Sequence, residues 1–209
     1  MKNISISEFI DSYISELKRC LEVLDKRSIE KVIKMLFLAY ERNKKVFIIG
    51  NGGSAATASH MACDLSKGTL KRVYDEKEKR FRVYSLTDNA ALMTAYGNDV
   101  SFDDIFVQQL SNLVERGDVV IALSGSGNST NVIKAVKYAK RFGAKTIGIL
   151  GFITGGKLGK IVDQAIIVSS NHYGPCEDIQ LVLDHIIISW ISIIKHEGRR
   201  SGNKAVPFR

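Results

Sequence analysis

Two short segments of this chain have the composition of phosphate-binding loops. Residues 50–54 (Gly-Asn-Gly-Gly-Ser) follow the apolar run 47–49, and residues 124–130 (Ser-Gly-Ser-Gly-Asn-Ser-Thr) follow the apolar run 119–123. Glycine lets the backbone approach a ligand closely, the N-terminus of a following helix attracts an anion, and the four hydroxyl groups of the second segment are further donors. The candidate ligands of a phosphate are Asn51, Gly52, Gly53, Ser54, Ser124, Ser126 and Ser129.

Either segment, taken alone, is equally well explained as a turn between a strand and a helix with an N-capping serine. The repetition of the pattern favours phosphate binding. Neither segment continues into the Gly-Lys-Ser/Thr of a P-loop, and neither matches the dinucleotide fingerprint with its acidic residue at the end of the next strand. We therefore expect a phosphorylated small molecule rather than a nucleotide.

Four ionisable residues outside these loops have spacings that suggest chemistry. His60 and Asp64 lie four residues apart in a helical segment, on one face and about 6 Å apart, where they suit two ligands of a divalent metal. An exposed pair without a function is the alternative. Glu177 and His185 lie eight residues apart in the final helical segment, about 12 Å along an ideal helix and too far to share one ion directly. Either the first turn after Pro175 is distorted, or the two residues serve the sites of different subunits.

Hydrophobic periodicity predicts the elements that must position these side chains. Helical patterns alternate with apolar runs, which lie near residues 45–50, 81–86, 118–123, 145–150 and 164–168. This alternation is typical of a three-layer α/β fold with a five-stranded parallel sheet and helices on both faces. Ligands of such sheets bind beyond the carboxyl ends of the strands, where both loops fall. Asp88, after the second strand, either accepts hydrogen bonds from sugar hydroxyls or caps the helix 89–96.

Helical segments flank this core at both ends of the chain. Two amphipathic helices are predicted between residues 7 and 42, with Ser28 as an N-cap between them, and a long helix covers about 176–197. The apolar arc of the last helix is wider than one sheet face requires. We therefore expect part of it to be buried between the subunits of a homo-oligomer.

Length and composition indicate one globular domain. The chain has 209 residues, 45% of them hydrophobic, and we divide it into a helical pair at 1–44, an α/β sugar-phosphate-binding part at 45–198 and a basic tail at 199–209. No apolar run approaches the ~20 residues of a membrane span and no signal-peptide pattern is present, so we expect a cytoplasmic protein. The net charge of +8 is spread over helix faces, the usual arrangement of solvated faces, and an anionic metabolite explains it as well as a nucleic acid does. We expect neither a nucleic acid nor a membrane as a partner.

Together, these residues resemble the SIS (sugar isomerase) domain family, and most closely its single-domain phosphoheptose isomerases. The resemblance covers nearly the whole chain and rests on the two loops, on His60, and on Glu177 with His185 in the final helix. It implies a flavodoxin-like α/β fold and a homotetramer with sites at subunit interfaces. The implied reaction converts sedoheptulose 7-phosphate to D-glycero-D-manno-heptose 7-phosphate. Several such proteins bind zinc, so zinc is the cofactor that the resemblance implies.

The resemblance also assigns roles to individual residues. His185 matches the histidine that acts as a general acid or base, and Asp64 stands at the position of a glutamate base. A divalent metal would be held by His60, Asp64, Glu177 and His185. Asn51 and Ser54 match the first sugar-phosphate loop, and the phosphate-binding hydroxyls are matched by Ser124, Ser126 and Ser129.

The sequence departs from the isomerases at four positions. Gly125 replaces a common threonine, Asp64 the glutamate, Glu177 a glutamine and Gln180 a histidine. Because aspartate reaches one methylene less far than glutamate, two alternatives stay open: a non-catalytic sugar-phosphate-binding or regulatory protein, and another sugar-phosphate enzyme. An isomerase is favoured because a binding protein needs the phosphate loops but not the four ionisable groups.

Overall fold

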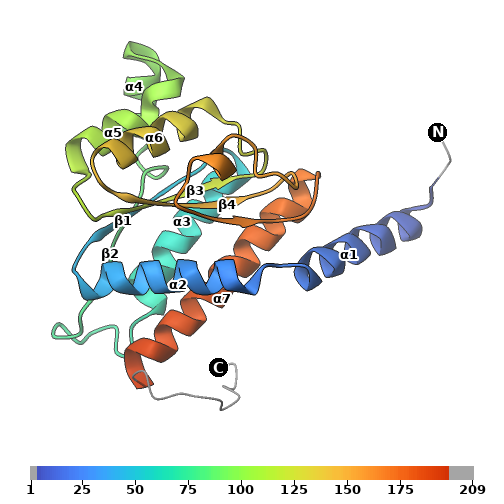
Figure 1. Cartoon of the computed structure of the whole chain (residues 1–209), viewed down its shortest axis with the longest axis horizontal. Helices are drawn as coiled ribbons and strands as arrows, with labels where there is room; N and C mark the ends of the chain where they lie inside the picture. The colour runs from blue at the N-terminus through green and yellow to red at the C-terminus, as the bar shows by residue number, and fades with distance from the viewer. Residues whose placement is uncertain (1–3, 198–209) are drawn as a thin grey trace.

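The computed structural model describes residues 4–197 and contains one sheet of five parallel strands (Figure 1). In chain order the strands are β1 (Lys45–Ile49), β2 (Arg82–Ser85), β3 (Val119–Ser124), β4 (Lys145–Leu150) and β5 (Gln164–Ile167). Their spatial order is β2-β1-β3-β4-β5, and every neighbouring pair is parallel. The predicted α/β fold with a five-stranded parallel sheet is confirmed.

The central strands are apolar on both faces because helices cover both faces of the sheet. Along β1, Val46 and Ile48 pack into one core while Phe47 and Ile49 pack into the other, as the two-residue period of a strand requires. All residues of β1 and β3 are buried, whereas those of β2, at one edge, are exposed or half-buried. One hydrophobic core therefore lies on each side of the sheet.

Helices form a layer on each face (Figure 1). One layer contains α4 (Ala90–Asp99), α5 (Ile105–Leu113) and α6 (Thr130–Arg141), and the other contains α2 (Lys26–Glu41), α3 (Gly53–Cys63) and α7 (Tyr173–Glu197). A π-helical turn η1 (Asp64–Gly68) extends α3, and two 3-10 turns are η2 (Phe102–Asp104) and η3 (Leu158–Lys160). Because α3, α6 and α7 each follow a strand, their first turns lie at the carboxyl edge of the sheet.

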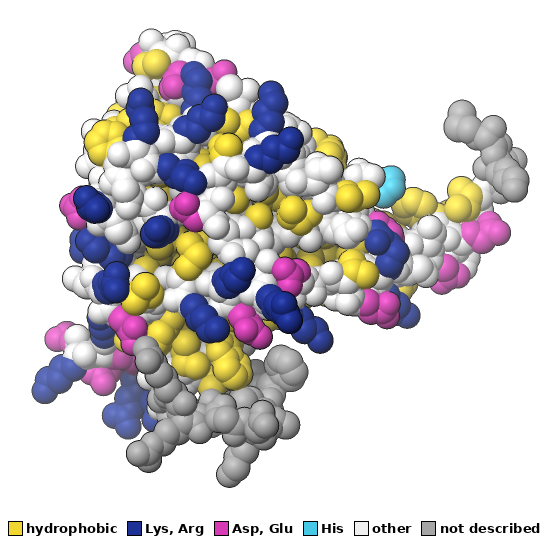
Figure 2. Space-filling model, in the orientation of Figure 1, with side chains coloured by type: hydrophobic (Ala, Val, Ile, Leu, Met, Phe, Trp, Pro, Cys, Tyr) yellow, Lys and Arg dark blue, Asp and Glu magenta, His cyan; other side chains and the backbone are white. Residues whose placement is uncertain are grey.

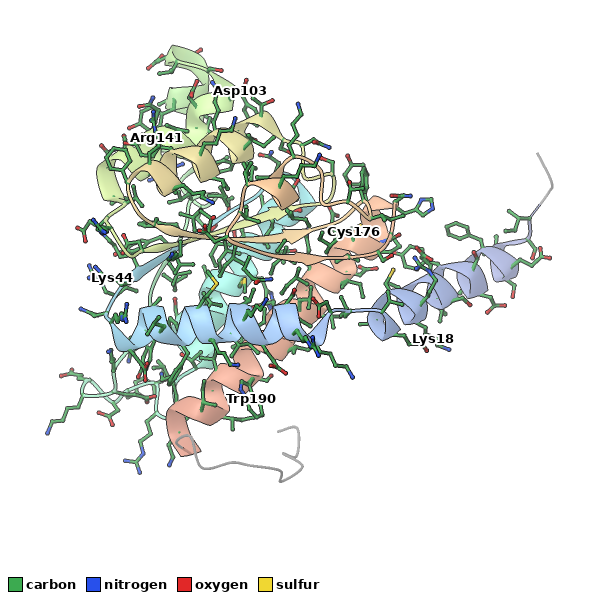
Figure 3. All side chains as sticks on the ribbon, in the orientation of Figure 1. Lys18, Lys44, Asp103, Arg141, Cys176 and Trp190 are labelled. Atoms are coloured by element: carbon green, nitrogen blue, oxygen red, sulfur yellow. The ribbon has the colours of Figure 1, made fainter. Side chains whose placement is uncertain are left out.

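The long helix α7 crosses one face of the sheet from the carboxyl edge. It begins at Tyr173, earlier than predicted, and includes Pro175 in its first turn, where a missing backbone N–H is tolerated. Figure 3 shows Cys176 near the start of the helix and Trp190 near its far end. Cys176 is fully buried and Trp190 is partly exposed. Within residues 4–197, none of the helices combines the length and the hydrophobicity of a membrane span.

The first helix, α1 (Ile6–Glu22), projects from the body of the protein (Figure 1). It begins with a complete capping box, in which Ser5 and Glu8 exchange hydrogen bonds between side chains and backbone. Cys20 is its one buried residue. Its exposed apolar side chains include Ile6, Phe9, Ile10 and Ile14. Figure 2 shows yellow, hydrophobic side chains along this projecting helix. Nothing within the described part of this single chain covers this face, hereafter the α1 apolar face.

Two details differ from expectation or lie outside the structure. The N-cap of α2 is Asp25, whose carboxylate accepts from the backbone N–H of Arg27, while Ser28 donates its hydroxyl to Asp25 at 2.6 Å. The prediction of Ser28 as the cap was therefore wrong, because the carboxylate three residues earlier is the better acceptor at that point. The predicted basic tail at 199–209 lies outside the described residues.

Candidate active site

All seven residues proposed from the two loops line one pocket at the carboxyl edge of the sheet. The loops follow the neighbouring strands β1 and β3, which brings them side by side. The pocket has a volume of about 270 Å³. It is lined by Asn51, Gly52, Gly53, Ser54, Leu123, Ser124, Gly125, Ser126, Ser129, Tyr173 and Glu177. Hydroxyl groups and the N-termini of two helices meet here, which suits a phosphate group, and this candidate site is hereafter called the phosphate pocket.

Some of these polar side chains hold the loops in shape. The amides of Asn51 and Asn131 exchange two hydrogen bonds of 2.9 and 3.0 Å and so tie the first loop to the start of α6. Ser54 is buried and donates its hydroxyl to Gln180 of α7 at 3.0 Å. Ser124 Oγ accepts a backbone N–H of its own loop at 3.0 Å. Asn51, Ser54 and Ser124 therefore shape the pocket before any ligand arrives.

Two hydroxyls of the second loop are better placed to meet a ligand. Ser126 Oγ accepts the backbone N–H of Asn128 at 3.2 Å, which leaves its hydroxyl hydrogen free to point at a phosphate oxygen. Ser129 is the N-cap of α6 by backbone geometry, yet its side chain makes no capping hydrogen bond. The alternative of an N-capping hydroxyl therefore does not hold at Ser129. Both side chains are half-buried at the pocket.

The helices α3 and α7 pack against each other and run in the same direction. At their first turns, a Cβ added at Gly53 would collide with the carboxylate of Glu177. Further along, His60 of α3 meets His185 of α7. Position 60 is seven residues after position 53, so it lies on the same face of α3, about 10 Å further along the helix axis. One pair of helices thus carries the phosphate pocket and, two turns later, a second group of side chains.

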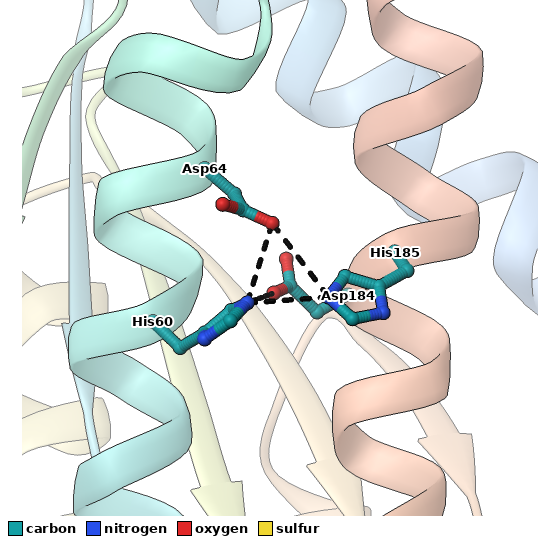
Figure 4. A group of neighbouring side chains, drawn as sticks. All are labelled: His60, Asp64, Asp184 and His185. Carbon is teal, nitrogen blue, oxygen red and sulfur yellow. Dashed lines mark hydrogen bonds and ion pairs between the residues drawn. The ribbon is translucent and has the colours of Figure 1, made fainter. Parts of the chain in front are cut away.

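This second group consists of His60, Asp64, Asp184 and His185, hereafter the four-residue cluster (Figure 4). One ligand-type atom from each residue lies within 4.8 Å of all the others. The two Nε2 atoms are 3.2 Å apart, and Asp64 Oδ2 lies 3.5 Å from His60 Nε2 and 3.8 Å from His185 Nε2. Two imidazoles and two carboxylates at these separations can bind a divalent metal or move protons.

Asp184 has an environment unlike that of the other three members. Its side chain is fully buried, and neither carboxylate oxygen has a hydrogen-bond partner among the described residues. Oδ2 lies 3.9 Å from His60 Nε2. Burial, with a smaller contribution from the charge of Asp64, raises the pKa of Asp184 to about 7. By contrast, the side chains of His60 and His185 are 46% and 55% exposed, so small molecules can reach them.

Glu177 does not belong to this cluster. Among residues 4–197 the metal-type group comprises His60, Asp64, Asp184 and His185, whereas Glu177 lines the phosphate pocket beside Gly53. The predicted metal ligands His60, Asp64 and His185 are therefore brought together, and Glu177 is not. The eight-residue spacing explains the separation, because α7 is a continuous helix from Tyr173 and its first turn is not distorted enough to bring Glu177 to His185.

Comparison with known proteins agrees with this architecture. Residues 8–151 match the SIS domain. The chain belongs to the SIS domain family. It is 34% identical over 187 residues to the phosphoheptose isomerase of Aliarcobacter butzleri, covering 90% of this chain and 95% of that protein. It is 39% identical over 154 residues to the phosphoheptose isomerase of a Nitratiruptor species, covering 73% and 79%.

A solved structure shows the same fold. The phosphoheptose isomerase from Neisseria gonorrhoeae superposes with a TM-score of 0.81 at 27% identity, over 90% of this chain and 98% of that one. The resemblance to SIS-domain isomerases is therefore confirmed over the length that the sequence predicted.

The structure explains one departure of this SIS domain from the isomerase pattern. A Cβ added at Gly125 would lie 2.8 Å from Cδ1 of Tyr173, so a threonine would press into this ring. The ring of Tyr173 also packs against Phe152 with centroids 4.9 Å apart. Gly125 therefore leaves room for an aromatic wall of the phosphate pocket. Tyr173 could have been suspected from the sequence only by its place just before the final helix.

Asp88 lies in a separate pocket of this SIS domain. Its carboxylate accepts hydrogen bonds from Ser59 and Ser85, and the pocket, of about 370 Å³, is also lined by Cys63 and Tyr84. The helix α4 is capped by Asn89, whose side chain accepts the backbone N–H of Leu92 at 3.0 Å. The alternative that Asp88 caps this helix was therefore wrong, and its contact with sugar hydroxyls stays a prediction.

Asp184 is the member of the cluster that was not predicted from the sequence. The signal was an acidic residue within the otherwise apolar arc of α7, next to Leu183 and one helical turn before Ile188, both of them buried. A charged residue on a buried helix face is rare unless it is paired or binds a metal. The partner across the interface, His60, is 124 positions away in the sequence and cannot be read from periodicity.

Proposed function

We propose that this protein is an aldose–ketose isomerase of sugar phosphates that converts sedoheptulose 7-phosphate to D-glycero-D-manno-heptose 7-phosphate. The observation that carries the proposal is the shared pair of helices, α3 and α7. They present a phosphate pocket at their first turns and the exposed imidazoles of His60 and His185 two turns later. Relatives named phosphoheptose isomerase, 34% and 39% identical, support the same substrate.

The reaction moves one proton between neighbouring carbons through an enediol. A base removes a proton from C1 of the ketose while an acid donates a proton to the carbonyl oxygen at C2. The enediol then loses the proton of its C1 hydroxyl and gains one at C2, which leaves an aldehyde at C1. The sequence of steps needs no external oxidant or reductant. It needs one base at carbon and one acid at oxygen.

Asp64 and His185 are suited to these two roles. Their side chains lie 3.8 Å apart, between Asp64 Oδ2 and His185 Nε2, and both are partly exposed. We assign Asp64 the proton transfer at carbon and His185 the proton transfer at oxygen. The serine loops hold the phosphate end of the substrate, with Ser126 and Ser129 as its direct hydroxyl donors. A phosphate fixed there leaves the carbonyl end to reach along α3 towards the histidines.

We propose zinc as the cofactor, held by His60, by one carboxylate oxygen of Asp64 and by Nε2 of His185. The proton transfers would then be carried out by the second oxygen of Asp64 and by Nδ1 of His185. The donor set fits, because imidazole nitrogens and carboxylate oxygens are common zinc ligands and these atoms converge in the structure. When bound, zinc would polarise the substrate oxygens as a Lewis acid. Removing it with a chelator should reduce turnover and should leave phosphate affinity nearly unchanged, since the phosphate pocket shares no residue with the cluster.

We further propose a homotetramer with sites at subunit interfaces. The α1 apolar face needs a cover, since Ile6 is 81% and Phe9 59% exposed in the single chain. Tyr13 is one of the contacts between α1 and α7: its hydroxyl donates to Asp178 at 2.6 Å, one residue after Glu177. A partner subunit packed on this face would therefore stand close to the phosphate pocket. The expected cytoplasmic location stays a prediction.

The alternative of a non-catalytic sugar-phosphate-binding protein is less well supported, because its function would not require the four-residue cluster. The isomerase and the binding protein can be distinguished by an assay. The zinc-loaded protein is supplied with sedoheptulose 7-phosphate, and the formation of an aldose phosphate is followed by NMR. Glucosamine 6-phosphate and fructose 6-phosphate serve as competing substrates. Turnover of the heptose is expected. Binding of a sugar phosphate with no turnover of any of the three would support the binding protein instead.

A further inference from the structure

We propose that Asp184 is a direct metal ligand in this protein and completes, with His60, Asp64 and His185, a site of two imidazoles and two carboxylates. The proposal rests on the metal-dependent isomerase described above and deepens it. It changes the predicted ligand set, because the fourth position within one chain is filled by Asp184 from the protein interior and not by the Glu177 of that chain, which lines the phosphate pocket.

The burial of Asp184 is the first observation behind this assignment. Its exposure is 0%, and both Oδ1 and Oδ2 lack a hydrogen-bond partner in the described chain. A buried carboxylate without a partner is costly, and carboxylates in such places are paired or coordinate metals. The nearest basic group, His60 Nε2 at 3.9 Å, is beyond hydrogen-bonding distance. Asp184 therefore has an unmet need for a cationic partner.

The direction of the side chain is the second observation. Figure 4 shows the carboxylate of Asp184 pointing from α7 into the space between the two histidines and Asp64. The separations between neighbouring donor atoms are 3.2, 3.5, 3.8 and 3.9 Å. Four ligands arranged tetrahedrally around zinc at about 2.0–2.1 Å would be roughly 3.3–3.4 Å apart. All pairs of donor atoms lie within 4.8 Å of one another, so shifts of about 1 Å or less would bring these donors onto one ion.

The arrangement of exposure fits a site that faces the substrate. Asp184 would hold the ion from the buried side, while His60 and His185, about half exposed, lie on the accessible side. Glu177 of the same chain lies beside Gly53 at the first turns of the two helices, too far along α7 to bind the same ion. Two carboxylates also balance the charge of a divalent ion inside the protein. Such a mixed nitrogen and oxygen set suits zinc, manganese, cobalt or iron.

The first test measures metal affinity by titration of the chelator-treated protein with zinc, in competition with a chromophoric chelator. Asp184→Asn keeps the shape of the side chain and removes its charge, and Glu177→Gln is the matched control on the same helix. We expect Asp184→Asn to weaken zinc binding at least tenfold and Glu177→Gln to change it less than threefold. Equal affinity of wild type and Asp184→Asn, or a larger loss in Glu177→Gln, would overturn the assignment.

A second test needs no variant and so does not depend on the folding of Asp184→Asn. Crystals of the wild-type protein grown with zinc are measured at the zinc absorption edge, and the anomalous peak is located. We expect the ion about 2.0–2.2 Å from a carboxylate oxygen of Asp184. An ion bound to the histidines with Asp184 more than about 3 Å away, or no ion at this place, would overturn the assignment.

The two proposals fail in different ways. Turnover of sedoheptulose 7-phosphate by wild type tests the isomerase and does not depend on which residues hold the metal. If turnover is present and Asp184 does not touch the ion, only the ligand assignment is wrong. If Asp184 binds the ion and no sugar phosphate is converted, only the isomerase is wrong.

Discussion

The Nε2 atoms of His60 and His185 lie 3.2 Å apart although the two residues are 125 positions apart in the chain. On α3, His60 lies about two turns beyond Gly53, and on α7, His185 lies about two turns beyond Glu177. The same two helices face the phosphate pocket at their first turns through Gly53 and Glu177. The distance from the phosphate pocket to the imidazoles is therefore fixed by the rise per turn of two packed helices. This fixed distance suits a short carbon chain that carries a phosphate at one end.

The phosphate pocket can be tested by removing its two available hydroxyls. Ser126→Ala and Ser129→Ala should each weaken the binding of sedoheptulose 7-phosphate by about 10- to 150-fold, because a hydrogen bond to a charged group contributes roughly 1.5–3 kcal/mol. Isothermal titration calorimetry measures the change. Ser111→Ala, on an exposed face of α5, is the control and should bind as wild type does. Wild-type affinity in both loop variants would remove the phosphate assignment.

Much of this pocket could be predicted from the sequence, because its signals are local. An apolar strand, a glycine turn and a helix start lie within a dozen residues, and the parallel sheet then places both loops at one edge. What could not be predicted is which polar side chains of the loops already make hydrogen bonds within the protein. The hydrogen bond from Ser54 to Gln180 and the link between Asn51 and Asn131 join residues distant in the chain.

The proton-transfer roles predict a loss of rate with little loss of binding. Asp64→Asn and His185→Ala should each lower turnover by about 10²-fold or more, the usual scale for losing a general acid or base. Binding of inorganic phosphate should stay near wild type, because neither residue lines the phosphate pocket. Asp11→Asn, on the exposed surface of α1, controls for the change of charge. Unchanged turnover in both site variants would contradict the assigned roles.

The four-residue cluster could be predicted only in part from the sequence. His60, Asp64 and His185 could be proposed because their spacing and the family resemblance point to them. Asp184 could not, because its role depends on the side-by-side packing of α3 and α7. Glu177 was assigned to the metal from the resemblance alone. Its own spacing of eight residues from His185 already indicated the separation that the structure shows.

Assembly is tested through the α1 apolar face. Wild type should elute as a tetramer by size-exclusion chromatography with light scattering at micromolar concentration. Phe9→Glu replaces an aromatic side chain that is 59% exposed in the single chain by a charged one, and it should shift the protein to smaller oligomers or monomers. Val73→Glu, at an exposed apolar residue of a loop, is the control. A monomeric wild type would contradict the shared-site arrangement.

The docking of α1 should depend on acidity through Glu16. A hydrogen bond from Arg19 is the main cause that lowers the pKa of Glu16 to about 2, and the same guanidinium also donates to the carbonyl of Ser169. An unfolded glutamate titrates near 4.3, so this stabilisation is present above that pH and is lost as the pH falls towards 2.

Urea unfolding of Glu16→Gln measures this contribution. The variant should be less stable than wild type by about 1 kcal/mol or less at pH 7, because the ion pair is partly exposed, and the difference should shrink by pH 3. Glu22→Gln, at the end of the same helix, should show no such dependence. A difference that stays constant between pH 7 and pH 3 would show that the Glu16 charge does not hold α1.

The central claim, that this protein performs enediol chemistry on a phosphorylated sugar, is tested most directly by proton exchange. The zinc-supplied wild-type protein is incubated with sedoheptulose 7-phosphate in D₂O, and the carbon next to the carbonyl is followed by NMR. An isomerase that works through an enediol incorporates deuterium at this carbon even when net conversion is slow, and His185→Ala should suppress the incorporation. No deuterium at this carbon in wild type, with sugar-phosphate binding intact, would contradict the account.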